Sequence, residues 1–132
     1  MFYQLIDYGV TDREERTRQR NVVSFLSRFK AFASKNGLVV FHRQDYKETL
    51  TELAIHPRQA REMILGLTVA NYYKGLGPGE RNGEEVGEFG LIDNGRELYI
   101  KLIIDNVHER AICCSFHFPE REIHYPFAED VG

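Results

Sequence analysis

Residues 64–75 read ILGLTVANYYKG, and this stretch separates two halves of the chain that carry different patterns. Before it, apolar residues recur at the three- and four-residue spacing of helices. After it, beyond the glycine-rich segment 75–83, apolar and polar residues alternate as they do in strands. We therefore expect an α+β fold in which N-terminal helices pack on one face of a small antiparallel sheet, with Lys74 at the junction.

The half before this stretch contains three segments with helical spacing. The first covers residues 21–36 and ends before Gly37, a residue type favoured just after a helix. The second opens at Asp45, whose spacing to Glu48 is that of an N-cap pair, and the third opens at Pro57. Thr68 is then expected to cap a short final turn that ends at residues 74–75. The residues expected to face the core are Val22, Phe25, Leu26, Phe29, Ala33, Leu50, Leu53, Ala54, Ala60, Met63, Ile64 and Leu67.

Two segments of this half have no single interpretation. Residues 1–10 fit either a short strand or an extension, whereas residues 11–20 are almost wholly polar. Thr11 and Glu14 stand at capping-box spacing, so a helix could begin there. Residues 38–42 fit a short strand or an extended link. We therefore treat the chain, 1–132, as one domain with an N-terminal extension (1–20), a core (21–119) and a tail (120–132).

Asn94-Gly95 is the strongest turn signal in the second half, because both residue types tolerate the positive φ angles of a type I′ hairpin. This turn sets a register in which Gly90 lies opposite Tyr99 and Glu88 lies opposite Lys101. Strand alternation then places these four residues on one polar face. The opposite, apolar face consists of Phe89, Leu91, Leu98, Ile100, Leu102 and Ile104.

A further strand is expected over residues 110–118, beside a central strand at about residues 97–104. Strict alternation would direct Ile112, Cys114, Phe116 and Phe118 into the core. The same alternation would place Cys113, Ser115 and His117 on the polar face. Glu88, Tyr99, Lys101 and His117 would then lie within reach of one small ligand. The tail after Pro119 fits either an edge strand or an unstructured end.

The composition argues against several classes of protein. A net charge of −3 does not suit a protein that binds nucleic acid by bulk charge, although a local basic cluster remains compatible with it. Cys113 and Cys114 are neighbours whose side chains point to opposite faces of a strand, so they cannot bridge each other, and this suits a reducing cytosol. Metal-binding spacings, a signal peptide and a membrane-spanning run are all lacking. We expect no metal, no cofactor, no membrane association and a cytoplasmic location.

Three segments carry a resemblance to a known family. They are residues 64–74 (ILGLTVANYYK), 96–101 (RELYIK) and 114–117 (CSFH), and the similarity runs in order and at similar spacing over roughly residues 22–119. This pattern resembles the MqsR (motility quorum-sensing regulator) family, toxins of type II toxin–antitoxin pairs. The resemblance implies a RelE-like α+β fold, metal-independent cleavage of mRNA and a cognate antitoxin protein that blocks the toxin. It leaves open a homodimer or a toxin–antitoxin hetero-oligomer.

The resemblance also implies which residues are catalytic. The family lysine that follows a Phe/Tyr-Tyr pair corresponds to Lys74, and the Tyr-x-Lys strand corresponds to Tyr99 and Lys101. A basic residue of the last strand corresponds to His117, where the best-known member has lysine, and a family glutamine falls near Glu88. The residues expected to bind the RNA substrate are Tyr73, Arg43 and Arg81.

These residue types suit metal-free RNA cleavage, in which the ribose 2′-OH attacks the adjacent phosphate. The reaction needs a base for the 2′-OH proton, an acid for the departing 5′-oxygen and cations for the phosphate. Imidazole titrates near neutral pH, so His117 suits the acid or the base, and Glu88 also suits the base. Lys74 and Lys101 suit the phosphate, while Tyr99 could donate to the phosphate or stack on a nucleobase.

Each residue also has an ordinary structural explanation. Glu88 with Lys101 is a common cross-strand ion pair, worth under about 1 kcal/mol. Tyr99 fits a half-buried sheet aromatic, His117 a structural histidine, and Lys74 a cation at a helix C-terminus. Their convergence on one face, with the resemblance, favours an endoribonuclease toxin. The alternatives are a catalytically inactive RNA- or protein-binding regulator of the same fold, and a small α+β domain whose polar face is a protein interface.

Overall fold

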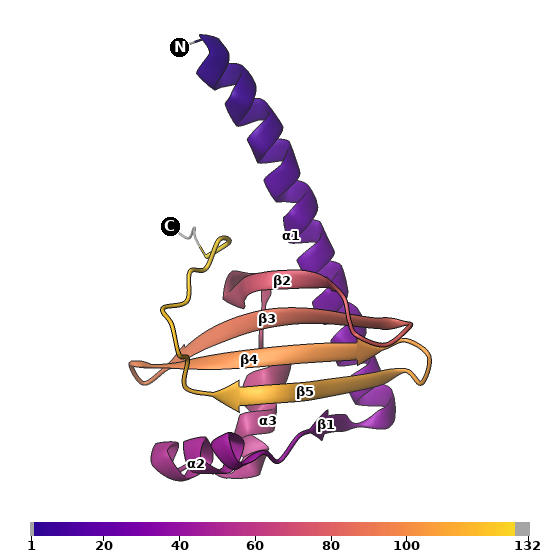
Figure 1. The fold of residues 1–132 in the computed structure, drawn as a ribbon, viewed down its shortest axis with the longest axis vertical. Helices are drawn as coiled ribbons and strands as arrows, with labels where there is room; N and C mark the ends of the chain where they lie inside the picture. Colours follow the sequence, from indigo (N-terminus) through magenta and orange to yellow (C-terminus); the bar gives the residue numbers. More distant parts are fainter. Residues whose placement is uncertain (1, 129–132) are drawn as a thin grey trace.

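A computed structural model describes residues 2–128 of the chain, and the side chains of residues 12–128. Its three α-helices and five-stranded sheet confirm the expected α+β class (Figure 1). The elements in order are α1 (Phe2–Asn36), β1 (Leu38–Val40), α2 (Gln44–Leu53), α3 (Pro57–Leu65), the 3₁₀ turn η1 (Val69–Asn71), β2 (Tyr72–Pro78), β3 (Glu84–Asp93), β4 (Arg96–Asp105) and β5 (Arg110–His117).

Helix α1 is continuous, and it resolves the ambiguous N-terminal segments. It begins at Phe2 rather than at the expected capping pair of Thr11, and it ends before Gly37, whose φ of +88° is the left-handed conformation that glycine adopts readily. Residues 12–18 are exposed, whereas Phe25 and Phe29 are fully buried. The C-terminal part of the helix therefore packs on the sheet, while its N-terminal part extends away from it (Figure 1).

The starts and ends of the shorter helices depart from two predictions. Arg43 occupies the N-cap position of α2, so Asp45 lies in the first turn rather than at the cap. Ala54 is exposed in the left-handed conformation that ends α2, instead of facing the core. Helix α3 begins at Pro57 as predicted, and the side chain of His56 caps it.

Strand β2 replaces the expected helical junction. Lys74 and Gly75 lie in a strand that pairs antiparallel with β3, and this strand continues through residue 78 into the glycine-rich segment. The buried ring of Tyr72 packs edge-on against Phe89, with 5.7 Å between the ring centroids. This contact anchors the start of β2 on the sheet, and tertiary packing of this kind overrides the local glycine signal.

The sheet has the order β1-β5-β4-β3-β2, with β4 in the centre as predicted. Strand β1 runs parallel to β5, so the sheet is mixed rather than wholly antiparallel. The predicted hairpin register is confirmed, because Gly90 pairs with Tyr99 and Glu88 pairs with Lys101. Asn94 and the residue after it both adopt positive φ angles, as the turn requires.

Strand β5 departs from the predicted alternation at a β-bulge. Lys101 pairs with Ser115, whereas the next residue of β4 pairs with Cys113, which leaves Cys114 as the extra residue. Cys113 therefore faces the core with none of its surface exposed, and Ile112 faces the polar side, opposite to the prediction for both. Burial raises the pKa of the Cys113 thiol to about 12. Residues 115–117, beyond the bulge, keep the predicted orientation.

The core lies between one face of the sheet and the helices. Helices α1 and α3 lie behind the sheet in Figure 1. Phe25 of α1 stacks on Phe89 of β3, with 6.0 Å between the ring centroids. Arg28 of α1 donates two hydrogen bonds, of 2.5 and 2.9 Å, to the Glu85 carboxylate at the start of β3. Within residues 2–128, no helix combines the length and apolar character needed to cross a bilayer.

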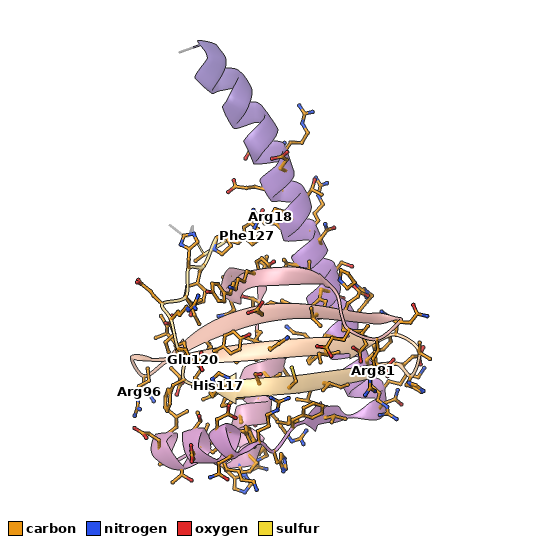
Figure 2. The ribbon with its side chains drawn as sticks, viewed as in Figure 1. Arg18, Arg81, Arg96, His117, Glu120 and Phe127 are labelled. Atoms are coloured by element: carbon orange, nitrogen blue, oxygen red, sulfur yellow. The ribbon has the colours of Figure 1, made fainter. Side chains whose placement is uncertain are left out.

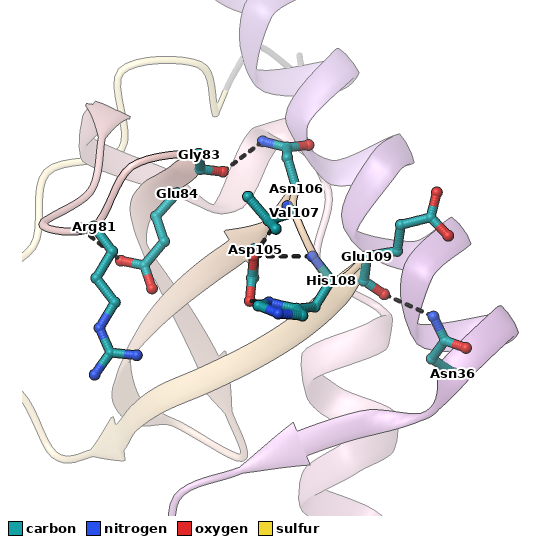
Figure 3. Close-up of polar contacts among 9 residues, drawn as sticks. All are labelled: Asn36, Arg81, Gly83, Glu84, Asp105, Asn106, Val107, His108 and Glu109. Atoms are coloured by element: carbon teal, nitrogen blue, oxygen red, sulfur yellow. Dashed lines mark hydrogen bonds and ion pairs between the residues drawn. The ribbon is translucent and has the colours of Figure 1, made fainter.

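The turn between β4 and β5 is held by side-chain hydrogen bonds (Figure 3). The Asp105 carboxylate accepts from the backbone N–H groups of Val107 and His108 and contacts His108 Nδ1 at 2.8 Å, which lowers the pKa of Asp105. Asn106 Nδ2 donates to the Gly83 carbonyl at 3.0 Å. The β4–β5 turn and the β2–β3 loop are therefore tied together at one end of the sheet.

Candidate active site

A hollow of about 330 Å³ lies on the face of the sheet opposite the helices. Four strands contribute the predicted residues, and the tail after β5 contributes the rest. We call it the Tyr99 hollow. Its lining residues are Tyr73, Lys74, Glu88, Tyr99, His117, Pro119, Glu120, Arg121 and Ile123. Four of the five predicted catalytic residues thus share one hollow with Tyr73, and Lys101 is the exception.

A hydrogen bond joins Glu88 and Tyr99 across β3 and β4. The phenol of Tyr99 donates to Glu88 Oε1 at 2.8 Å. Burial raises the pKa of Tyr99 well above its usual value, and the bond to the Glu88 carboxylate raises it further. Tyr99 therefore stays protonated near neutral pH. It can donate hydrogen bonds in this hollow, but it cannot serve as a general base.

Gly75 provides the space that the Glu88 carboxylate occupies. A Cβ atom at position 75 would lie 2.4 Å from Glu88 Oε2, and the φ of Gly75 is +80°. The preceding residue, Lys74, is the backbone partner of Glu88 in the β2–β3 ladder, and the register shifts on both sides of this pair. The Nζ of Lys74 lies 4.9 Å from the centroid of the Tyr73 ring, a cation–π contact. Among residues 12–128, no carboxylate lies within ion-pair distance of Lys74, so its charge is available to an anionic ligand.

His117 ends β5 on the other side of Tyr99. The two ring centroids are 5.2 Å apart. Nδ1 of His117 lies 2.9 Å from the carbonyl oxygen of Phe118, and Nε2 lies 3.8 Å from Oδ2 of Asp45. A carbonyl oxygen can only accept, so Nδ1 carries the hydrogen of that bond. Nε2 is therefore the nitrogen left to exchange a proton with a ligand.

The tail after β5, as far as residue 128, forms one wall of the Tyr99 hollow, rather than the expected edge strand or unstructured end. Residues 129–132 of that prediction lie outside the part of the chain that the structure describes. Tyr125 donates to Glu97 Oε2 at 2.7 Å, and Ile123 is buried. A Cβ atom at Gly90 would lie 2.6 Å from the Tyr125 hydroxyl, so glycine allows this close approach. The tail thereby brings Arg121, a residue that the sequence did not indicate, to the hollow. The apolar residues of an otherwise polar tail were the only signal of this packing.

A second stretch of the tail reaches the edge of the sheet. The buried ring of Phe127 stacks on Tyr72, with 5.7 Å between the ring centroids. The guanidinium carbon of Arg18 on α1 lies 5.4 Å from the centroid of the same Phe127 ring. Figure 2 shows Arg18 and Phe127 close together beside α1. The described part of the tail is thus held at two places, at Tyr125 and at Phe127.

Lys101 lines a second hollow, of about 380 Å³, further along the same face. We call it the Phe41 hollow. Arg43 and Arg81, both predicted to bind RNA, line it with Lys101. Its remaining lining residues are Val39, Phe41, Glu80, Glu84, Val86, Ile103, Asp105, Arg110, Ile112 and Cys114. The predicted residues therefore divide between two neighbouring hollows on one face of the sheet.

No protein-family model, curated protein or solved structure matches the chain. Among the side chains that the structure describes, no three histidine, cysteine, aspartate or glutamate residues lie close enough to hold a metal ion together. The function is therefore inferred from the side chains that line the Tyr99 hollow. The polar groups that line it are an imidazole, two carboxylates, two phenols and two cations, which come from His117, Glu88, Glu120, Tyr73, Tyr99, Lys74 and Arg121.

Proposed function

We propose that the chain is a metal-independent endoribonuclease, an MqsR-like toxin that cleaves mRNA and is neutralised by a cognate antitoxin. One observation carries the proposal. Glu88 and His117 stand on the two sides of Tyr99, within one hollow that also holds Lys74. Cleavage by an internal nucleophile needs two proton-transfer groups beside a bound phosphate, and this arrangement supplies both groups and a cation.

In the proposed reaction, one proton is removed from the attacking oxygen and one is given to the leaving oxygen. The 2′-oxygen forms a bond to phosphorus as its proton passes to a base, and the bond from phosphorus to the 5′-oxygen breaks as an acid protonates that oxygen. Glu88 and His117 Nε2 are the two groups that exchange these protons. Tyr99 is protonated and adjacent to both, so it donates a hydrogen bond to the phosphate or holds Glu88. Lys74 and Arg121 stabilise the charge on the phosphate.

The test is incubation of the purified protein with mixed-sequence single-stranded RNA in excess EDTA. We expect the wild type to cleave, and we expect His117→Ala to lower the rate about 10²- to 10⁴-fold, the usual contribution of a general acid or base. His124→Ala is the matched control, because His124 is exposed on the tail and lines neither hollow. A requirement for a divalent metal, or equal cleavage by His117→Ala, would contradict this mechanism.

A catalytically inactive regulator of the same fold is the second candidate. Tyr99 already donates a hydrogen bond to one oxygen of the Glu88 carboxylate, which the cleavage mechanism uses for proton transfer. This observation favours the inactive protein. Growth arrest on expression, abolished by His117→Ala, would argue against this candidate. Retention of RNA without cleavage, in vitro or on the ribosome, would support it.

A further inference from the structure

One transverse row of residues on the open face of the sheet is apolar. Cross-strand pairing places Val39 beside Ile112, Ile112 beside Ile103, and Ile103 beside Val86. None of the four is buried, and Val39 keeps 41% of its surface exposed. The helices cover the opposite face, and within residues 2–128 no helix or strand packs on this row (Figure 1). An exposed apolar row of this kind, surrounded by polar residues, is typical of a binding surface.

Phe41 adds an aromatic ring at the end of this row. Its backbone N–H donates to the Cys113 carbonyl at 3.0 Å, which continues the pairing of β1 with β5, and strand alternation places its side chain on the same face as Val39. The residue is 40% exposed, and Arg43 Cζ lies 5.8 Å from the ring centroid. An accessible ring beside a guanidinium group is a common stacking platform for nucleobases.

The cations around the Phe41 hollow lack ion-pair partners. Among residues 12–128, no carboxylate lies within ion-pair distance of Arg43, Arg81, Lys101 or Arg110. These four positive charges are therefore free to meet a phosphate, as basic residues that contact an RNA backbone must be.

Two of the three carboxylates that line this hollow are already engaged. Glu84 Oε1 accepts from the backbone N–H of Arg81 at 3.2 Å, and Asp105 is held by His108 (Figure 3). The guanidinium group of Arg81 extends away from the Glu84 carboxylate in that view. Glu80 is the third carboxylate. Four basic side chains line the hollow against three carboxylates, so it carries a small net positive charge although the whole chain is acidic.

We propose that the Phe41 hollow binds one unstacked nucleobase of a single-stranded RNA, next to the phosphodiester held in the Tyr99 hollow. The base would lie on Phe41 and the apolar row, and the flanking phosphates would meet Arg43, Arg81 and Lys101. This inference rests on the proposed function, since it names the form of RNA that the same face accepts. A duplex would keep its bases stacked and unavailable to the ring.

The spacing of the two hollows suits a strand that runs along the sheet. Lys101 lies two residues from Tyr99 and two residues from Ile103 on β4, which is roughly 7 Å in each direction. Figure 2 shows His117 and Arg81 toward opposite ends of β5. Lys101 therefore stands between the proposed cleavage site and the proposed base site, where a phosphate that links the two would pass.

Binding is measured separately from cleavage, with a fluorescent single-stranded 2′-O-methyl oligonucleotide that lacks the attacking hydroxyl. By fluorescence anisotropy, we expect Phe41→Ala to weaken binding about fivefold to a hundredfold, the usual effect of losing one stacked base. Phe41→Leu keeps an apolar side chain of similar size and so preserves the fold. We expect its affinity to lie between those of Phe41→Ala and the wild type. Val23→Ala, an exposed apolar position on α1, is the control and should bind as the wild type does.

The charges are tested by the salt dependence of the same binding. We expect Arg43→Gln and Arg81→Gln each to lower the slope of log affinity against log salt by about 0.7, the value for one lost contact with a single strand. Arg58→Gln, an exposed cation on α3 away from both hollows, should leave the slope unchanged. Phe41→Ala should weaken binding without changing the slope.

The outcomes separate this inference from the proposed function. Cleavage of RNA by the wild type, with affinity and slope unaltered in the Phe41 and arginine variants, would overturn the base site and leave the nuclease standing. Phe41-dependent binding without any cleavage would support the base site and remove the nuclease. Equal affinity for a duplex of the same sequence, or binding of a protein partner on this face in place of RNA, would overturn the base site.

Discussion

The two faces of the sheet are held by different interactions. On the face toward the helices, Phe89, Leu98 and Ile100 are fully buried against α1 and α3, and their positions are fixed by packing. On the open face, Glu88, Tyr99 and His117 are half-buried and held by individual hydrogen bonds. One set of strands thus carries two sets of side chains, because successive residues face opposite sides wherever the alternation is unbroken.

This difference teaches how the fold can separate stability from chemistry. Burial of apolar side chains stabilises the sheet from one side, so the other side is free to carry polar groups that contribute little to folding. A substitution on the helix-covered face should therefore change the free energy of unfolding. A substitution at a residue that lines the Tyr99 hollow should cost less stability than that and should lower activity.

The largest effect on stability is expected for Phe89→Ala. Phe89 packs against Phe25 and Tyr72 and has no exposed surface, so its truncation leaves a cavity. We expect a loss of about 3–5 kcal/mol in the free energy of unfolding, measured by urea denaturation. The exposed Val23→Ala on α1 should cost under about 0.5 kcal/mol. A loss below about 1 kcal/mol for Phe89→Ala would show that this face is not the principal source of stability.

A smaller effect is expected from two matched tyrosines on the open face. Tyr99 donates to Glu88 at 2.8 Å, and Tyr125 donates to Glu97 at 2.7 Å. The pKa of each phenol is raised mainly by burial and further by the hydrogen bond to its carboxylate. Each Tyr→Phe substitution should lower the free energy of unfolding by about 1–2 kcal/mol, because it removes one hydrogen bond to a charged group.

Activity should distinguish these two variants. Tyr99→Phe should slow RNA cleavage about tenfold or more, since the phenol lies between the two proton-transfer groups. Tyr125→Phe should stay within about threefold of the wild type, because Ile123 and Phe127 remain buried and still hold the tail. If both variants lost activity equally, the phenol of Tyr99 would have only a structural role.

The sequence predicted the open face well where strand alternation is unbroken. The Asn94-Gly95 turn and the apolar pattern together define the β3–β4 register, so the positions of Glu88 and Tyr99 follow from local information. The bulge at Cys114 could not be predicted in the same way. It depends on how β5 packs between two neighbours, and no residue type in that strand requires it.

The local sequence pattern also could not predict which elements form the walls of the site. Lys74 was expected near a helix end because glycines follow it, but pairing with β3 places it in a strand. The wall that carries Arg121 depends on contacts of Tyr125 and Phe127 with residues far away in the sequence. Alternation therefore predicts which face a side chain occupies, whereas only the assembled sheet determines which hollow it lines.

The smallest expected effect comes from the ion pair between Arg28 and Glu85, which joins α1 to the helix-covered face. The bond to Arg28 holds the pKa of Glu85 below its usual value of 4.5, and the same bond raises the pKa of Arg28. A lowered carboxyl pKa in the folded state stabilises the fold above the unfolded pKa. This stability is lost as pH falls from about 4.5 through the lower folded value.

A double-mutant cycle measures the free energy that this ion pair contributes to folding. Both side chains are about one-third exposed, at 38% and 34%, so we expect a coupling free energy under about 1 kcal/mol between Arg28→Gln and Glu85→Gln at neutral pH. The coupling should fall as the pH drops below about 4.5 and through the lower folded-state pKa of Glu85, because the carboxylate then becomes protonated. Cleavage at neutral pH should be the same in all four proteins, because neither residue lines a hollow on the open face. A coupling that persisted in acid would mean that packing of the Arg28 side chain, rather than its charge, holds α1 on the sheet.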